Sequence, residues 1–189
     1  TVSDSGGYLY APNGLDKEKF DYLMELKNVK RGRLKEMAAD FQGLEFYEEE
    51  RPWSVKCDIA LPCATQNELN EVEAKMLIDN GCILVSEGAN MPSTPEAISV
   101  FQNAKILFAP GKASNAGGVA TSGLEMSQNS LRMNWTRQEV DSKLQQIMKD
   151  IHTSCAKYGK EGDHIDYVKG ANIAGFVKVA DAMLDQGIV

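Results

Sequence analysis

The stretch DIALPCATQNEL, residues 58–69, decides the fold class of this chain. Its first six residues form an apolar run that ends in a turn, and this pattern predicts a short buried strand. The following TQNE, residues 65–68, fits a capping box, in which Thr65 and Glu68 satisfy each other's backbone donors at the start of a helix. We expect that helix to end at Gly81.

The same alternation continues downstream. Residues 83–85, ILV, form an apolar run too short for a helix, and residues 93–96, STPE, combine a cap, a proline and a glutamate as a helix start does. Another short strand is expected at residues 106–108. Short, continuously apolar strands that alternate with helices indicate a parallel sheet covered on both faces. The predicted class is α/β with a Rossmann-like parallel sheet.

Upstream, the chain opens on Thr1-Val2 followed by SDSGG at residues 3–7, without an initiator methionine. We expect these residues to end a strand of the parallel sheet that is entered halfway, so that the sheet is truncated at its start. Two helical stretches, broken around Gly32, should follow. We therefore interpret the chain as a fragment of a larger fold.

From about Lys112 the pattern changes to helices alone. One helix rich in small residues should run to about Met133, a capping box at residues 136–139 opens a second, and a third follows from about Ile165. We expect a partial dinucleotide-binding domain over residues 1–111. A C-terminal helical segment over residues 112–189 should pack on it.

Composition and charge exclude several classes of function. Of 189 residues, 43% are hydrophobic and 25% charged, as in a soluble domain, and no apolar run could span a bilayer or act as a signal peptide. The net charge of −7 argues against a nucleic-acid partner. Four cysteines without a CxxC pair and only two histidines argue against a metal site and suit reduced thiols in the cytoplasm.

Ligands of a doubly wound sheet bind beyond the carboxyl ends of its strands. The expected strand ends, residues 3–7, 62–67, 87–92 and 109–112, are rich in small or amide residues. The carboxamides there suit ribose hydroxyls or a nicotinamide amide. Turns also favour such residues, so each strand end is a weak signal when taken alone.

The first strand end should meet the adenosine ribose, where an acidic side chain binds a 2′-hydroxyl and cations favour a 2′-phosphate. Two serines flank an aspartate there, and a basic cluster follows in the next helical region. Hydroxyls with a basic cluster suit a phosphate dianion, although a solvated basic helix end would look the same. The residues concerned are Ser3, Asp4, Ser5, Lys27, Lys30, Arg31 and Arg33.

The stretch NAGGVATSG, residues 115–123, is unusual for a helix because it carries three glycines. Glycine costs up to about 1 kcal/mol at an interior helix position. Either another helix packs closely here, or a ligand lies against the bare backbone with the Ser122 hydroxyl and the Asn115 carboxamide directed at it.

Several motifs together resemble the cofactor domain and C-terminal helices of hexameric glutamate dehydrogenases, over essentially all 189 residues. They are SDSGG, LPCATQNEL, EGAN followed by MP, NAGGVATSGLEMSQN, and GANIAGF at residues 170–176. The resemblance implies a role for Ser122 in binding the side-chain carboxylate of glutamate, with Val119 lining the same pocket. It also implies a cofactor-binding set, which is closest to the NADP-preferring members. That set is Ser3, Asp4, Ser5, Lys27, Lys30, Arg33, Asn90 and Asn115.

The reaction implied by this resemblance is the reversible oxidative deamination of L-glutamate to 2-oxoglutarate and ammonia, with NADP as cofactor and NAD also possible. Such enzymes are homo-hexamers, and their catalytic lysine and aspartate lie in a substrate domain upstream. We therefore expect no catalytic residue in this chain and no activity from it alone. Two alternatives stay open: a non-catalytic α/β interaction module, and a dehydrogenase for a branched or aromatic amino acid. The Ser122 hydroxyl argues against the latter.

Overall fold

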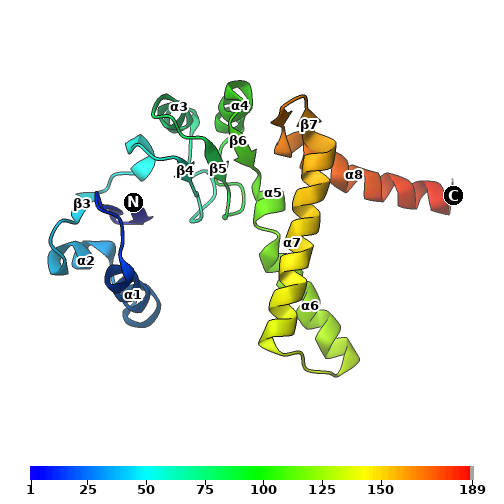
Figure 1. The fold of residues 1–189 in the computed structure, drawn as a ribbon, viewed down its shortest axis with the longest axis horizontal. Coiled ribbons are helices and arrows are strands. Elements are labelled where there is room, and N and C mark those ends of the chain that lie inside the picture. The colour runs from blue at the N-terminus through cyan, green and yellow to red at the C-terminus, as the bar shows by residue number, and fades with distance from the viewer. Residues whose placement is uncertain (188–189) are drawn as a thin grey trace. The chain divides into compact units, whose positions relative to one another are not determined.

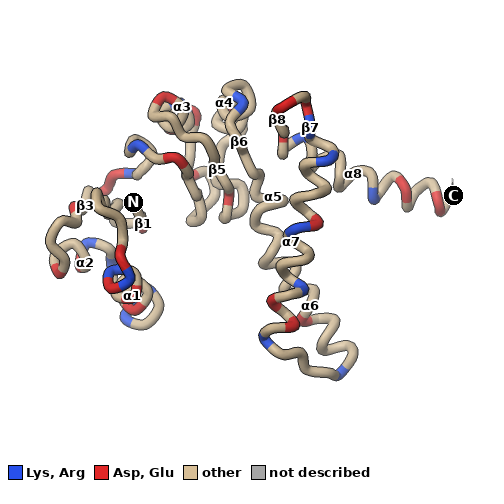
Figure 2. Tube along the Cα trace, viewed as in Figure 1, with Lys and Arg blue, Asp and Glu red and all other residues tan. Residues whose placement is uncertain are grey.

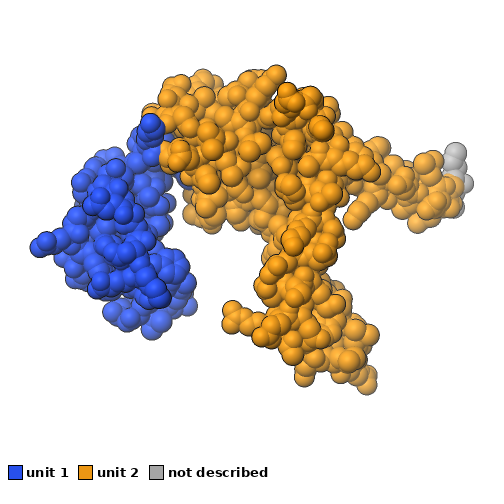
Figure 3. Space-filling view, in the orientation of Figure 1, with its two compact units in different colours: residues 1–56 blue, residues 57–189 orange. Residues whose placement is uncertain are grey.

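The computed structural model describes residues 1–187 and divides the chain into two compact units, Thr1–Lys56 and Cys57–Val189 (Figure 3). Figure 1 shows the order of the helices and strands in each. The last two residues of the helical segment expected over 112–189 lie outside the described residues. The domain boundary expected near residue 111 stays a prediction.

Unit 1 is built on a three-stranded antiparallel sheet in the order β1-β2-β3. Its core is formed by Leu9, Leu26, Leu34 and Met37, each at most 2% exposed. Its elements are β1 (Val2–Asp4), β2 (Gly7–Tyr10), α1 (Lys17–Glu25), a π-helical turn (Leu26–Lys30), α2 (Leu34–Asp40), β3 (Glu45–Glu48) and a 3₁₀ turn (Pro52–Ser54). The predicted break around Gly32 is confirmed, because it separates the π-helical turn from α2.

The opening residues were expected to end a parallel strand, and that prediction is wrong. Asp4 pairs with Gly7 in a tight hairpin, which turns the chain back antiparallel into β2. Gly7 has φ +141°, and a Cβ there would lie 2.1 Å from the carbonyl oxygen of Tyr47. Glycine is therefore required for β2 to approach β3 at this point. Ser5 and Gly6 form the turn of a hairpin and Gly7 begins β2, so SDSGG does not mark a strand-to-helix step.

Unit 2 contains a parallel sheet in the order β4-β5-β6, as the α/β prediction requires. Val85 and Phe108 are buried in its strands, and Leu77 and Phe101 are buried on its helices. Burying each such side chain contributes about 1.5–3 kcal/mol. The elements are β4 (Ile59–Ala60), α3 (Glu71–Asp79), β5 (Leu84–Ser86), α4 (Pro95–Ala104), β6 (Leu107–Ala109), α5 (Gly111–Ser114), α6 (Gly117–Leu131), α7 (Arg137–Gly159), β7 (Lys160–Glu161), β8 (His164–Ile165) and α8 (Tyr167–Gln186).

Two of the three predicted helix-capping patterns are confirmed. Thr94 caps α4 with Pro95 in its first turn, and Thr136 forms a capping box with Glu139 at the start of α7. The box predicted at Thr65 and Glu68 is wrong, because Asn70 and Glu73 form the box of α3. The intervening Leu69 is held in a parallel β-bridge to Ser93, which delays the helix.

The helix expected from Lys112 to Met133 is interrupted. It forms as α5 and α6, separated by Asn115 and Ala116. Gly117 opens α6 against α7, and a Cβ on it would lie 3.6 Å from Leu144 Cδ1. The hairpin of β7 and β8, between α7 and α8, was not predicted.

Helices α7 and α8 cross at a contact between two glycines. A Cβ on Gly170 would lie 2.0 Å from the carbonyl oxygen of Cys155 and 3.0 Å from the backbone nitrogen of Gly159. A Cβ on Gly159 would lie 2.2 Å from the carbonyl oxygen of Asp166. Backbone therefore packs directly on backbone at this crossing.

Figure 2 shows acidic and basic residues interspersed along most elements of both units, with several of the cations on the segment from α1 to α2. Neither α7 nor α8, nor any other helix within residues 1–187, combines the length and apolar composition that a membrane span requires.

Candidate functional site

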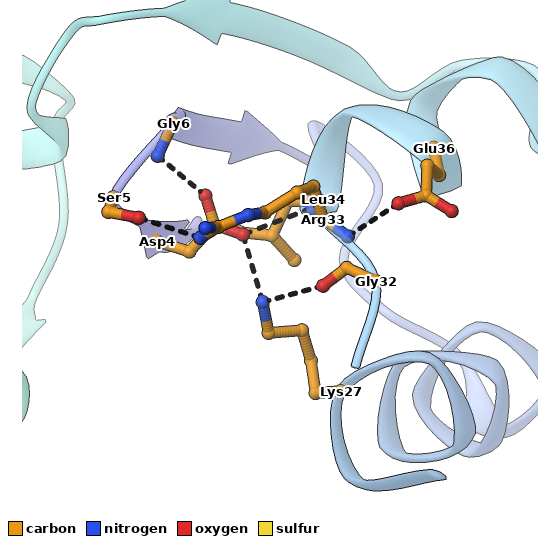
Figure 4. Close-up of polar contacts among 8 residues, drawn as sticks. All are labelled: Asp4, Ser5, Gly6, Lys27, Gly32, Arg33, Leu34 and Glu36. Carbon is orange, nitrogen blue, oxygen red and sulfur yellow. Dashed lines mark hydrogen bonds and ion pairs between the residues drawn. The ribbon is translucent and has the colours of Figure 1, made fainter. Parts of the chain in front are cut away.

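The hairpin turn of unit 1 gathers most of the predicted phosphate-binding residues around Asp4 (Figure 4). One carboxylate oxygen of Asp4 accepts the N–H of Gly6 at 2.9 Å. The other accepts the ammonium of Lys27 at 2.9 Å and the N–H of Leu34 at 3.1 Å. The Asp4 side chain is only 10% exposed. This carboxylate therefore fastens the hairpin turn to the start of α2.

The environment of Asp4 keeps it ionised. Burial by itself raises the pKa of a carboxyl, but the hydrogen bonds from Gly6, Lys27 and Leu34 and the charge of Lys27 outweigh it. The pKa of Asp4 consequently lies below its ordinary value. Asp4 and Lys27 form a neutralised pair, with the Lys27 ammonium also donating to the carbonyl of Gly32 at 3.0 Å.

Ser5 and Arg33 present the groups of this cluster that face solvent. The guanidinium of Arg33 donates to the Ser5 hydroxyl at 2.6 Å, and both residues are exposed. Ser3, on β1, is exposed as well. We call Ser5 and Arg33 the hairpin cluster. It offers a hydroxyl and a planar cation, a combination that suits an oxyanion.

Lys30, also predicted to bind the cofactor, has different neighbours. Its ammonium pairs with Glu25 at 3.2 Å and lies 5.4 Å from the centre of the Tyr22 ring. Lys27 belongs to the inner side of the turn, where it neutralises Asp4. Of the two lysines, the structure thus brings only Lys27 into contact with the hairpin.

In unit 2, two predicted residues meet at the carboxyl end of the parallel sheet. Asn90 follows β5 and Asn115 ends α5, and the Nδ2 atom of Asn115 lies 2.7 Å from Oδ1 of Asn90. The same Nδ2 donates to the carbonyl of Ala89 at 3.1 Å. Asn90 is exposed and Asn115 half-buried, so the pair lies at the protein surface. We call Asn90 and Asn115 the amide pair.

A cavity of about 590 Å³ lies at the carboxyl ends of β5 and β6, and neither Asn90 nor Asn115 lines it. Its walls include Met91, Ile98 and Val168, and its polar residues include Glu87 and Lys112. Gln66 and Asn67, also at the carboxyl end of β4, are exposed. Asn67 has φ 56°, and its N–H donates to the carbonyl of Met91 at 3.0 Å. The backbone of Asn67 thus anchors the loop that follows Asn90.

Val119 and Ser122, predicted to bind the substrate, both lie on α6. Val119 is 73% exposed, and the Ser122 hydroxyl donates to the carbonyl of Gly118 at 3.3 Å. A Cβ on Gly118 or Gly123 would meet nothing within 4 Å. A Cβ on Gly117 would make only an ordinary contact with Leu144 of α7, so close helix packing does not require any of the three glycines. Within the described residues, no hydrogen bond joins Ser122 to the amide pair.

The sequence prediction gave no individual role to Glu87 or Ser114, whose hydrogen bonds join the loop that carries Asn90 to α5. Glu87 is 3% exposed, and its carboxylate accepts the N–H groups of Gly111 and Ser93. Ser114 Oγ lies 2.5 Å from the carbonyl oxygen of Glu87. The sequence contains one signal that points to Glu87, an acidic residue directly after an apolar strand. A carboxylate at such a position is either solvated or bound by backbone donors.

Within residues 1–187, no three His, Cys, Asp or Glu side chains lie close enough together to bind a metal ion. The four cysteines are free, and Cys63 at the end of β4 is exposed.

The comparisons with known proteins agree on one family. The NAD(P)-specific glutamate dehydrogenase of Xylanibacter ruminicola is 66% identical over 189 residues, which are 100% of this chain and 42% of that protein. The NADP-specific glutamate dehydrogenase of Haemophilus influenzae is 60% identical over 190 residues, again 100% of this chain and 42% of that protein.

A crystal structure of Plasmodium falciparum glutamate dehydrogenase superimposes with a TM-score of 0.90 at 49% identity, covering 99% of this chain and 40% of that one. The chain thus spans about 42% of the length of the two curated relatives. The profile of the Glutamate/Leucine/Phenylalanine/Valine dehydrogenase family matches residues 1–187, and the chain belongs to that family.

Proposed function

We propose that this chain supplies cofactor and substrate-carboxylate contacts to an NADP-linked glutamate dehydrogenase. The reaction is the reversible oxidative deamination of L-glutamate to 2-oxoglutarate and ammonia. The observation that carries the proposal is the inward position of Asp4, which leaves Ser5 and Arg33 as the exposed groups of the hairpin. The relatives named for NADP or NAD(P) use support it.

The occupied carboxylate of Asp4 explains the preference for NADP. A carboxylate that binds the 2′-hydroxyl of NAD needs a free acceptor directed at the ribose. Asp4 instead accepts three hydrogen bonds from within unit 1. A 2′-phosphate dianion can bind the Arg33 guanidinium and the Ser5 hydroxyl with charge-assisted hydrogen bonds. NAD, which lacks this phosphate, gains less from the same groups.

The amide pair serves the nicotinamide end of the cofactor. Each carboxamide carries a donor and an acceptor, which match the ribose hydroxyls and the nicotinamide amide. The cofactor itself supplies the hydride chemistry when it is bound. The role of Asn90 and Asn115 is to hold the ring in one orientation, which lowers the entropic cost of reaching the reactive geometry.

The exposed face of α6 serves the substrate. Ser122 and Val119 lie three residues apart and hence on one face of the helix. In this proposal the Ser122 hydroxyl donates to the side-chain carboxylate of glutamate, and Val119 lines the aliphatic part of the pocket. The lysine and aspartate that handle proton transfer come from a domain outside this chain. The chain alone is inactive for that reason.

The assembly and the compartment are also part of the proposal. The active enzyme is a homo-hexamer, as the family resemblance implies. Four free cysteines suit the reducing conditions of the cytoplasm.

The test uses the full-length protein that contains this sequence. Initial rates are measured with glutamate, leucine, phenylalanine and valine, each with NADP and with NAD. We expect turnover of glutamate with NADP to exceed every other combination. A preference for an apolar amino acid, or no turnover of any of the four, would refute the proposal.

A further inference from the structure

Glu87 is a buried carboxylate to which the proposed function assigns no ligand contact. Its side chain reaches across from the end of β5 to two different segments. One carboxylate oxygen lies 2.6 Å from the backbone nitrogen of Gly111, and the other lies 3.2 Å from that of Ser93. Burying a carboxylate is unfavourable unless donors converge on it. Two backbone N–H groups do so here.

The backbone of Glu87 is bound to the same region. Its N–H donates to the carbonyl of Ala109 at 3.0 Å, and its carbonyl oxygen lies 2.5 Å from Ser114 Oγ. A Cβ on Gly111 would lie 2.8 Å from the carbonyl oxygen of Ala89, so the first residue of α5 lies against the loop after β5. Glu87 thus joins that loop to α5 through both its side chain and its main chain.

These bonds form a closed ring with the amide pair. Gly111 accepts the N–H of Asn115 at 2.9 Å, and Asn115 donates back to Ala89 and Asn90. The loop after β5 and helix α5 are therefore attached at two points. Glu87 makes one attachment and Asn115 makes the other. Because a ring fixed at two points cannot rotate about either one, Glu87 limits the positions that the amide pair can adopt.

We propose that Glu87 is a positioning residue for the nicotinamide end of the cofactor and that it acts through the amide pair. This inference rests on the proposed function and extends it to a residue without ligand contact. The carboxylate is needed because it has two acceptor oxygens. In Glu87→Gln one acceptor becomes an NH₂ group, which would face a backbone N–H, so one of the two hydrogen bonds that the Glu87 carboxylate accepts, from Gly111 and from Ser93, is lost.

The experiment is a double-mutant cycle in the full-length protein, with Glu87→Gln, Asn115→Ala and the double variant. The dissociation constant of NADPH is measured by its fluorescence, and kcat and KM for NADP are measured with glutamate. We expect each single variant to raise the dissociation constant about tenfold. The double variant should be no weaker than the worse single variant by more than about threefold, because both changes release the same ring.

Asp166→Asn is the matched control. Asp166 is another carboxylate that joins two elements, since it accepts the N–H of Lys169 and the side-chain amide of Gln102, each at 3.0 Å. The same chemical change there should lower the melting temperature without altering the affinity for NADPH. An equal loss of affinity in Asp166→Asn would show that general destabilisation explains the effect, and this would overturn the inference.

Further outcomes separate the inference from the proposed function. The inference would be overturned in an active enzyme if the double variant raised the dissociation constant of NADPH by the full product of the two single effects. It would also be overturned if Glu87→Gln left that constant unaltered. A wild-type protein without NADP-dependent glutamate turnover would overturn the proposed function itself. Should Glu87→Gln fail to fold, Ser114→Ala takes its place in the cycle. It removes only the hydroxyl beside the Glu87 carbonyl and should weaken NADPH binding about threefold, again without adding to Asn115→Ala.

Discussion

The side-chain amide of Asn115 donates to Oδ1 of Asn90 across 2.7 Å, although 25 residues separate the two in the sequence. Asn90→Ala removes this acceptor together with a carboxamide proposed to face the nicotinamide ribose. A hydrogen bond contributes about 0.5–1.5 kcal/mol, so we expect NADPH to bind up to about tenfold more weakly. Isothermal titration calorimetry of the full-length protein would measure this change in the dissociation constant of NADPH. Asn103→Ala, on the exposed face of α4, is the control and should bind as the wild type does.

Arg33→Gln should change cofactor choice. The substitution removes the cation that lies beside Ser5, so the dissociation constant for NADP should rise about 10- to 100-fold while that for NAD changes little. Lys35→Gln provides the matched control, because Lys35 lies in the first turn of α2, which Arg33 precedes, and pairs with Glu48 at 2.8 Å. The proposed phosphate site is wrong if both cofactors weaken equally in Arg33→Gln.

Asp4 should make the stability of unit 1 depend on pH in the acid range. Its pKa is depressed in the folded state, so its contribution is complete above the ordinary aspartate pKa and is lost as the pH falls toward the folded value. Asp4→Asn should cost about 1–3 kcal/mol near neutral pH and flatten the stability profile between about pH 5 and pH 3. Urea unfolding at several pH values measures both effects, and a profile as steep as that of the wild type would contradict this account.

Ser122→Ala should reduce selectivity for glutamate over norvaline. The variant retains the helix but lacks the hydroxyl proposed to donate to the side-chain carboxylate, so kcat/KM for glutamate should fall about 10- to 100-fold and that for norvaline should hold. Ser127→Ala is the control, because Ser127 lies on the same helix and its hydroxyl donates to the carbonyl of Gly123 at 2.9 Å. Unchanged discrimination between the two substrates in Ser122→Ala would refute the role of Ser122.

Local sequence signals predicted the parts of the fold that depend on near neighbours. The capping box at Thr136 and Glu139 needs only contacts within one turn, and the structure contains it. The similar pattern at Thr65 and Glu68 fails because Leu69 is held by backbone bonds to Pro92 and Thr94. Such contacts between distant segments leave no mark in a short window of sequence.

The candidate site, like the fold, combines features that are visible in the sequence with contacts that are not. Serines and asparagines at strand ends and beside glycines are visible in the sequence, and this is why Ser5, Asn90 and Asn115 were predicted as site residues. The bond between Asn90 and Asn115, and the double attachment of Glu87, depend on two segments folding side by side. Lys30 was predicted to bind the cofactor because of its charge, but its neighbours Glu25 and Tyr22 lie on its own helical segment. The position of a lysine in the sequence therefore does not determine which group its long side chain contacts.

The crossing of α7 and α8 has a consequence for how this part of the molecule tolerates change. At Gly159 and Gly170 no side chain separates the two helices, so no rotamer adjustment there can absorb an added methyl group. The spacing at that point is set by main-chain atoms and is independent of the residue sizes elsewhere on either helix. Substitutions along the outer surface of α8 can therefore change its charge and polarity while the distance between the two axes at the crossing is preserved.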